Sequence, residues 1–346
     1  MERIYELANK LSSIAAVSGQ EYTGLEQLTE LCSGYFDSYE TTPVGSFIGR
    51  INCSKEGAKT LLLDAHFDEV GFIVSEICEG GFLKVVNIGG IDPRILSASE
   101  VLIHGKQTFT GIFTSKPPHL QEKSDKDKPL KLTDLAIDTG YSKEKLEKIV
   151  SIGTPISYRS PVTRLQGDYI AGKSFDDRIC ITAILRALEM LKGKDLPVNI
   201  AVQFSGGEET GYKGAITSSY RISPDYAVVL DVANVYVPNS PIYLKDIKTG
   251  GGIKISYSAQ TSRRLTNIAV RTAEKNNIKY QLDAEPNNTG TNSSAVQTSS
   301  GGIPTVLVSV PLKNMHTANE VVDLSDVLEA AKFIREFAIE LGHSGF

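Results

Sequence analysis

The chain has 346 residues, of which 41% are hydrophobic and 22% charged, and its net charge is −5. These values are typical of a globular protein with one large domain or two ordinary ones. The mild negative charge argues against nucleic acid as the main partner. No run of about eighteen apolar residues is present, so we expect no membrane span.

The N-terminal segment, Met1 to Glu6, is charged and lacks the apolar core of a signal peptide. The cysteines are scattered and show no CxxC spacing; they are Cys32, Cys53, Cys78 and Cys180. Such cysteines are typical of reduced thiols. We therefore expect a cytoplasmic protein.

Two helices and two strands are predicted before residue 66. Apolar residues recur at helical spacing over residues 2–17 and again over 21–34. Strands are predicted over 47–51 and 60–65. The second strand is an apolar run suited to a sheet that is covered on both faces, and it leads directly into His66.

A β-rich insertion is predicted over residues 71–165, where glycines and short β-type runs dominate. These runs are 70–74, 82–88, 101–104 and 108–114. The polar, lysine-rich stretch 121–131 predicts a mobile loop. The insertion would divide a discontinuous main domain into two parts, 1–70 and 166–346.

Strands and helices alternate in the rest of the chain, beginning with a helical pattern over 179–191. The predicted strands are 198–204, 226–231, 252–258, 278–283 and 304–310. The predicted helices are 210–219, 262–276, 291–299 and 325–341. This alternation predicts an α/β fold with a mainly parallel, mixed sheet and helices on both faces.

Two adjacent carboxylates, Glu208 and Glu209, follow the buried-strand pattern of residues 198–204 and the pair Gly206-Gly207. In open α/β folds, ligands bind just outside the carboxyl ends of the strands. At such a place one acid can hold a metal while the other moves a proton. The structural alternative is a solvated pair of glutamates on a loop.

Another polar cluster, His66-Phe67-Asp68, ends the apolar run at residues 61–63. A histidine ligand usually donates its second ring nitrogen to a carboxylate, which fixes the orientation of the ring. Positions two apart in an extended chain point the same way, so Asp68 is placed to orient His66. The alternative is a turn with a buried histidine.

Three further places offer metal-type ligands. Asp176 and Asp177 open a helix, where one of them is explained as a cap, but two exceed what a cap needs. Asp231 ends the apolar run 226–230, where an ionised carboxylate is costly unless it is paired or bound to a metal. His316 follows the strand pattern at 306–310, and its alternative is an exposed histidine without a role.

Together these residues indicate a site with two metal ions. His66, one of the pair Asp176-Asp177, one of the pair Glu208-Glu209, Asp231 and His316 stand at strand ends or at a helix start. Mixed nitrogen and oxygen ligands suit divalent metals, and five exceed what one tetrahedral zinc needs. They suit two ions roughly 3.5–4 Å apart with a bridging carboxylate. The chain lacks HExxH, GxSxG and P-loop motifs.

With these motifs the chain resembles the TET-type, glutamyl aminopeptidase-like dinuclear zinc aminopeptidases, some of which are labelled endoglucanases. The matching stretches are Asp64 to Phe72, Ser174 to Arg178, Gly207 to Gly211, Val229 to Val232 and Met315-His316. Further matches lie in the insertion, at Ile103 to Gly105, Pro117 to His119 and Ile137 to Gly140. The resemblance therefore spans almost the whole chain.

The resemblance implies a role for each of these side chains. His66 and Asp231 would hold one metal ion, Glu209 and His316 the other, and Asp176 would bridge them. Glu208 would be the general base and Asp68 would orient His66. The metals would be two Zn²⁺ ions, with Co²⁺ or Mn²⁺ as alternatives.

The resemblance also implies that the two parts of the chain have different functions. Residues 1–70 and 166–346 would form the catalytic metallopeptidase domain, and 71–165 the dimerisation domain. Dimers would assemble into tetrahedral dodecamers. The chain departs from the family pattern at Lys313-Asn314, at Asn292 and at Gly250 to Gly252, none of which is a metal ligand.

We therefore expect an aminopeptidase that removes N-terminal residues from peptides through a metal-bridging hydroxide, with Glu208 as general base and then acid. A glucan hydrolase is the alternative within the hydrolases, but glycosidases use two carboxylates without metals. A non-catalytic assembly scaffold is the third alternative; it predicts the loss of a ligand or of the base, and all are present.

Overall fold

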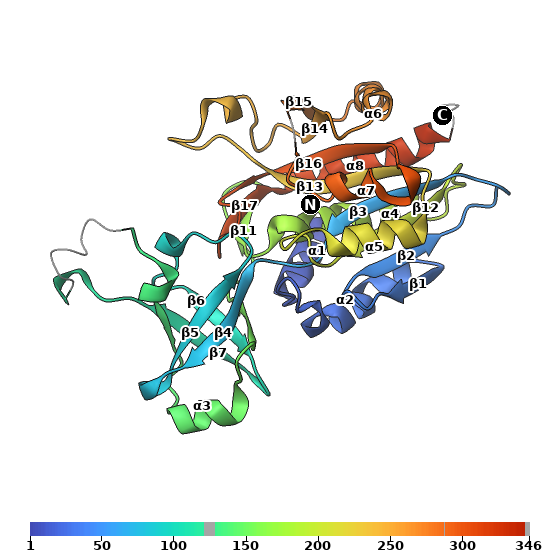
Figure 1. The fold of residues 1–346 in the computed structure, drawn as a ribbon. Helices are drawn as coiled ribbons and strands as arrows, with labels where there is room; N and C mark the ends of the chain where they lie inside the picture. The colour runs from blue at the N-terminus through green and yellow to red at the C-terminus, as the bar shows by residue number, and fades with distance from the viewer. Residues whose placement is uncertain (121–128, 287, 343–346) are drawn as a thin grey trace.

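The structure is a computed structural model that describes residues 1–120, 129–286 and 288–342. A large sheet forms the centre of the α/β part (Figure 1), with the strand order β1-β2-β12-β3-β13-β16-β17-β11-β10; β14 joins β16 and β15 joins β14. Its strands are β1 (Ser38–Thr41), β2 (Phe47–Ile51), β3 (Thr60–His66), β10 (Thr163–Arg164), β11 (Tyr169–Gly172), β12 (Asn199–Ser205), β13 (Tyr226–Asn234), β14 (Ile253–Ser258), β15 (Tyr280–Glu285), β16 (Thr305–Lys313) and β17 (Glu320–Asp323).

The four central strands, β12, β3, β13 and β16, are parallel to one another. The strands flanking them pair antiparallel, on the side of β2 and β1 as well as on the side of β17, β11 and β10. β14 is antiparallel to β16 and parallel to β15. The prediction of a mixed sheet in an α/β fold is confirmed, and the parallel part lies at its centre.

Helices cover both faces of the sheet (Figure 1). One face carries α1 (Glu2–Ser13), α2 (Leu25–Cys32), α4 (Phe175–Leu191), α6 (Arg263–Lys275) and α8 (Leu324–Leu341). The other face carries α5 (Lys213–Ile222) and α7 (Ser293–Val296). Because side chains alternate along a strand, Leu61 and Leu63 of β3 pack on the first face and Leu62 on the second. This two-sided burial explains the apolar run.

The inserted region contains a closed barrel with the strand order β4-β5-β8-β7-β6-β9. Its strands are β4 (Gly71–Ile77), β5 (Phe82–Ile88), β6 (Glu100–His104), β7 (Thr108–Thr114), β8 (Ala136–Asp138) and β9 (Pro155–Tyr158), and α3 (Lys143–Ile149) packs on it. The barrel has a hydrophobic core of its own, in which the Phe72 ring meets Phe113 and Tyr158 edge to face.

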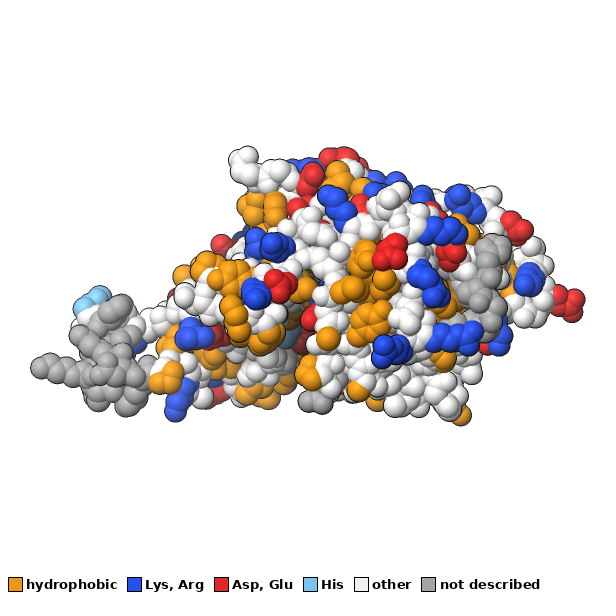
Figure 2. Space-filling view, turned by 90° about the horizontal axis from the view of Figure 1, so that it is seen from above, with side chains coloured by type: hydrophobic (Ala, Val, Ile, Leu, Met, Phe, Trp, Pro, Cys, Tyr) orange, Lys and Arg blue, Asp and Glu red, His pale blue; other side chains and the backbone are white. Residues whose placement is uncertain are grey.

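The barrel projects from the α/β part (Figure 1), and from above the molecule is elongated with the barrel on its left side (Figure 2). On the face shown in Figure 2, positive and negative side chains alternate over the α/β part. In the described ranges, none of the helices combines the length and the apolar character needed to cross a bilayer. All four cysteines are free thiols, and Cys32 and Cys180 are buried.

Several helix ends differ from the sequence prediction. The helix predicted over 2–17 ends at Ser13 because Val17 turns into a β-bridge with Glu69. The helix predicted over 291–299 contracts to α7, and a separate 3₁₀ turn follows at Ser299–Gly301. The strands β1, β8, β9, β10, β11 and β17 were not predicted. Most of the predicted lysine-rich loop, at 121–128, lies outside the described residues.

A buried ion pair joins the segment just before the barrel to the segment that follows β11 in the α/β part. Lys173 Nζ lies 2.6 Å from Glu69 Oε2, and both side chains are almost fully buried. The other oxygen of Glu69 accepts the backbone N–H of Ala16 at 2.9 Å. The pair therefore ties the segment after His66 to the segment before Asp176.

Candidate metal centre

The parallel centre of the sheet brings the predicted site residues to one edge. His66 is the last residue of β3 and stands opposite Ser205, the last residue of β12, whose following turn carries Glu208 and Glu209. Asp231 lies near the end of β13. The five predicted metal ligands and Glu208 all line one cavity of about 410 Å³; they are His66, Asp176, Glu208, Glu209, Asp231 and His316.

Asp176 stands between the two histidines. One of its oxygens, Oδ1, lies 2.9 Å from His66 Nε2, and the other, Oδ2, lies 3.2 Å from His316 Nε2. Glu209 Oε1 lies 3.3 Å from the same nitrogen of His316. A carboxylate whose two oxygens face two different nitrogen ligands has the arrangement that a bridge between two metal ions requires.

Two overlapping groups of ligand atoms are compact enough to hold a cation. One consists of His66, Asp176 and Glu209, the other of His66, Asp177 and Asp231, and within each group the atoms lie within 4.8 Å of one another. Asp177 was not among the predicted ligands. Its neighbour Asp176 was selected through the family resemblance, because the sequence pattern alone did not distinguish between the two aspartates.

Neither aspartate at the start of α4 caps the helix. The N-cap residue is Ser174, without a side-chain cap, and both aspartates have non-helical backbone angles. Asp177 Oδ2 instead accepts the backbone N–H of His66 at 3.2 Å. The capping alternative considered for this pair therefore does not apply.

Asp68 holds the turn that carries the two glutamates as well as facing His66. Its carboxylate accepts the backbone N–H of Glu208 at 3.0 Å and that of Glu209 at 3.1 Å. His66 Nδ1 lies 3.0 Å from the carbonyl oxygen of Asp68 and 3.6 Å from its Oδ1. Of these two oxygens, the carbonyl is within hydrogen-bonding distance of the ring, so the orienting contact comes from the backbone of Asp68.

Glu320, at the start of β17, was missed by the sequence analysis. It is buried, and its two oxygens accept the backbone N–H of His316 at 2.8 Å and that of Asp176 at 3.0 Å. One carboxylate thus fixes two predicted ligands that are 140 positions apart along the chain. The sequence carries no local signal for this role, because Glu320 stands in an ordinary run before a helix.

Burial and mutual repulsion dominate the electrostatics of the site. Burial raises the pKa of Glu208 to about 10; His66 opposes this rise, and the charge of Asp231 adds to it. Burial also raises the pKa of Asp231 and of Asp177 well above the ordinary value. For Asp176, burial pushes the pKa up, but the hydrogen bonds with His316 and His66 outweigh it and leave the pKa below its usual range.

The donor set fits divalent cations. Glu208 Oε1 and Asp177 Oδ1 are buried and have no hydrogen-bond partner within the described residues. The carboxylates in the cavity outnumber the histidines, and buried carboxylates are stable as anions only when they are paired or coordinate a metal. Cations between Asp176, Glu209, Asp231 and the two histidines would supply the missing positive charge.

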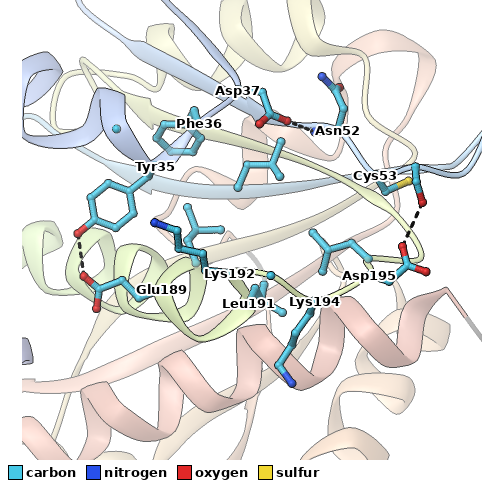
Figure 3. A pocket seen from close by; sticks show the side chains of 16 residues that line it. Tyr35, Phe36, Asp37, Asn52, Cys53, Glu189, Leu191, Lys192, Lys194 and Asp195 are labelled. Carbon is cyan, nitrogen blue, oxygen red and sulfur yellow. Dashed lines mark hydrogen bonds between the residues drawn. The ribbon is translucent and has the colours of Figure 1, made fainter.

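A second and larger cavity, of about 590 Å³, lies away from these residues, between the segment 34–54 and the end of α4 (Figure 3). Several of its polar groups are paired with one another: Tyr35 donates to Glu189, Asp37 accepts the backbone N–H of Asn52, and Ser54 donates to Asp195. None of its described lining residues is a histidine. This cavity therefore does not share the chemistry of the metal centre.

Comparison with known proteins places the chain in a family. A sequence model of the M42 glutamyl aminopeptidase family matches residues 45–333. The chain therefore belongs to this family of peptidases. It is 28% identical over 342 residues to the lysyl aminopeptidase of Pyrococcus furiosus, covering 97% of each chain.

Two solved structures show how widely the fold is shared. The TET1 peptidase of Pyrococcus horikoshii, which can assemble into a tetrahedron or a large octahedral shell, has 30% identity and a TM-score of 0.85 over 97% of this chain and 99% of its own. A Thermotoga maritima protein described as an endoglucanase has 25% identity and a TM-score of 0.78 over 97% of this chain and 99% of its own. The family and the lysyl aminopeptidase support aminopeptidase activity.

Replacing Glu320 by glutamine should weaken the binding of Zn²⁺. The new amide group can accept only one of the two backbone N–H groups, so His316 or Asp176 loses its support. We expect affinity to fall about 10- to 100-fold, the effect typical of groups that orient metal ligands. Competition with a fluorescent zinc chelator measures it.

The matched control is Glu329→Gln. Glu329 is also a buried glutamate that accepts a backbone N–H, that of Lys279 at 3.0 Å, but it lies on α8, outside the cavity. Equal zinc affinity in both variants would show that Glu320 does not support the ligands.

Proposed function

We propose that this protein is a metal-dependent aminopeptidase with two divalent ions. His66 and Asp231 would hold one ion, Glu209 and His316 the other, and Asp176 would bridge them. The observation that carries the proposal is the position of Asp176, whose two oxygens face His66 and His316 at 2.9 and 3.2 Å. Zinc suits this donor set, and Co²⁺ and Mn²⁺ also bind nitrogen and oxygen ligands.

When bound, such ions polarise the scissile carbonyl group and lower the pKa of water towards neutrality. Glu208 would carry out the proton transfers. Its Oε1 is buried without a hydrogen-bond partner among the described residues. Glu208 would accept a proton from the attacking water and deliver it to the leaving amine. Its backbone N–H is held by Asp68, which keeps the side chain over the cavity.

Glu208→Gln should abolish most activity without loss of metal. The amide has nearly the same shape as the carboxylate but cannot accept a proton, and general-base catalysis contributes about 10²- to 10⁴-fold. We expect kcat for leucine p-nitroanilide to fall by that factor while metal content, measured by plasma emission spectrometry, stays at the wild-type value.

The control for this variant is Glu274→Gln, an exposed glutamate on α6 that contacts Tyr280. It should keep both activity and metal. Full peptidase activity in Glu208→Gln would exclude Glu208 as the base, whereas loss of metal in that variant would indicate that it is a ligand.

Glucan hydrolysis is the second candidate, because two similar structures carry the word endoglucanase in their descriptions. Glycosidases place two carboxylates on either side of the sugar bond and need no metal. Here the carboxylates lie among two histidines, and Asp176 contacts both of them. This mixture of ligands favours the peptidase over the glucanase.

Removal of metal distinguishes the two activities. Dialysis against a chelator should abolish release of p-nitroaniline from leucine p-nitroanilide, and added Zn²⁺ or Co²⁺ should restore it, because the carbonyl is no longer polarised without the ions. Carboxymethylcellulose should release no reducing sugar in either state. Sugar release that survives the chelator would favour the glucanase instead.

We further propose that the chain, through the β-rich insertion at 71–165, forms dimers that assemble into a tetrahedral dodecamer. The support is the projection of the barrel away from the α/β part (Figure 1) and the likeness to the TET1 peptidase over nearly the whole chain. A purely structural assembly role would leave Glu208 and the ligand residues without a purpose.

Light scattering after size-exclusion chromatography tests the assembly. We expect a particle with about twelve times the chain mass of 37.5 kDa. A variant that carries a flexible linker in place of residues 71–165 should give only single chains. A wild-type chain that stays at 37.5 kDa would contradict the proposal.

A further inference from the structure

The cavity extends beyond the metal centre along the face of β14 and β15. At that end a lysine lies among the carboxylates that line the cavity. Asp231 of β13 stands opposite Ser309 of β16, and Ser309 stands opposite Lys254 of β14. Residues directly opposite each other point to the same face of a sheet. Since neighbouring strands lie about 4.8 Å apart, Lys254 stands roughly 10 Å from Asp231 on the face that bears the metal centre.

The same alternation gathers two carboxylates around this lysine. Ser256 and Asp283 are opposite each other, and Glu285 follows Asp283 by two positions, so all three share the face of Lys254. Lys254 Nζ lies 2.6 Å from Glu285 Oε1 and 3.3 Å from Asp283 Oδ2. Lys254, Asp283 and Glu285 line the same cavity as the candidate metal ligands.

This group, Lys254, Asp283 and Glu285, carries one positive and two negative charges. The lysine is nine-tenths buried and is already held by both carboxylates. Glu285 Oε1 accepts Lys254 and the hydroxyl of Ser256, whereas no hydrogen bond within the described residues involves Glu285 Oε2. An incoming cation would therefore find a free carboxylate oxygen and a net negative charge. The same net charge would repel an incoming anion.

We propose that this end of the cavity receives the side chain of the N-terminal residue of the peptide and selects lysine and arginine. The inference rests on the proposed aminopeptidase function. The aliphatic stem of such a side chain would lie along Leu244, Leu307 and Met315 in the cavity wall, and its charged end would reach Glu285 and Asp283. Long basic side chains bury their stems and keep the charged group among polar partners in this way.

The test compares p-nitroanilides of lysine, arginine, norleucine and glutamate. Norleucine has the stem of lysine without its ammonium group. A hydrogen bond to a charged group contributes about 1.5–3 kcal/mol, so we expect kcat/KM for lysine to exceed that for norleucine roughly 10- to 150-fold. In the double variant Asp283→Asn/Glu285→Gln this ratio should fall to about 1.

Binding supplies a second measurement that does not depend on turnover. In calorimetric titrations, free lysine should bind the wild type more tightly than norleucine, and the double variant should lose this difference. The control Glu274→Gln, an exposed carboxylate on α6 outside the cavity, should keep the wild-type preference. Asp283→Asn alone changes a partly exposed residue on the outermost strand, so it tests the idea even if the double variant does not fold.

Two results would overturn the inference. A preference for glutamate that disappears in Lys254→Met would make the lysine the selecting group. A lysine-to-norleucine ratio that is unchanged in the variants would remove Asp283 and Glu285 from substrate selection. Absence of hydrolysis of every substrate, norleucine included, would instead contradict the proposed aminopeptidase function.

Discussion

The structure is organised around carboxylates that are crowded together away from water. Asp176, Asp177, Glu208, Glu209 and Asp231 meet at one edge of the sheet, where two histidines of the described chain, His66 and His316, lie with them. Such a group repels itself, and burial makes each charge more costly. Cations bound between these side chains would resolve both difficulties at once. The fold therefore has to hold these side chains in place against their own repulsion.

The surrounding structure provides this restraint through backbone hydrogen bonds. Asp68 holds the backbone of Glu208 and Glu209, and Glu320 holds that of Asp176 and His316. In both cases a buried carboxylate fixes two functional residues through their N–H groups and leaves their side chains free to face the cavity. Few such contacts are needed, because the ends of the parallel central strands already lie together at this edge of the sheet.

The sequence predicted those parts of the molecule that depend on local patterns. The apolar runs at β3, β12, β13 and β16 gave the central strands, and the polar residues at their ends gave the candidate ligands, which the structure brings into one cavity. Their roles as ligands, and that of Glu208 as base, stay predictions. The α/β fold class and the family are confirmed.

What the sequence could not predict depends on contacts between distant segments. Glu320 supports the site only because β17 lies beside β16, and Asp177 reaches His66 only through the geometry at the start of α4. Lys254 enters the cavity because β14 runs antiparallel to β16 in one particular register. A shift of one residue would have turned its side chain to the opposite face.

The pair Glu69–Lys173 has a consequence for the history of the chain. It joins Glu69, two residues before the first barrel strand, to Lys173, which follows β11, through two buried side chains 2.6 Å apart. The entropic cost of closing a loop grows only slowly with its length. Once Glu69 and Lys173 are paired, the segment between them can therefore lengthen, shorten or be exchanged with little loss of stability. Members of one lineage can thus build different quaternary shapes while the chemistry next to the junction stays the same.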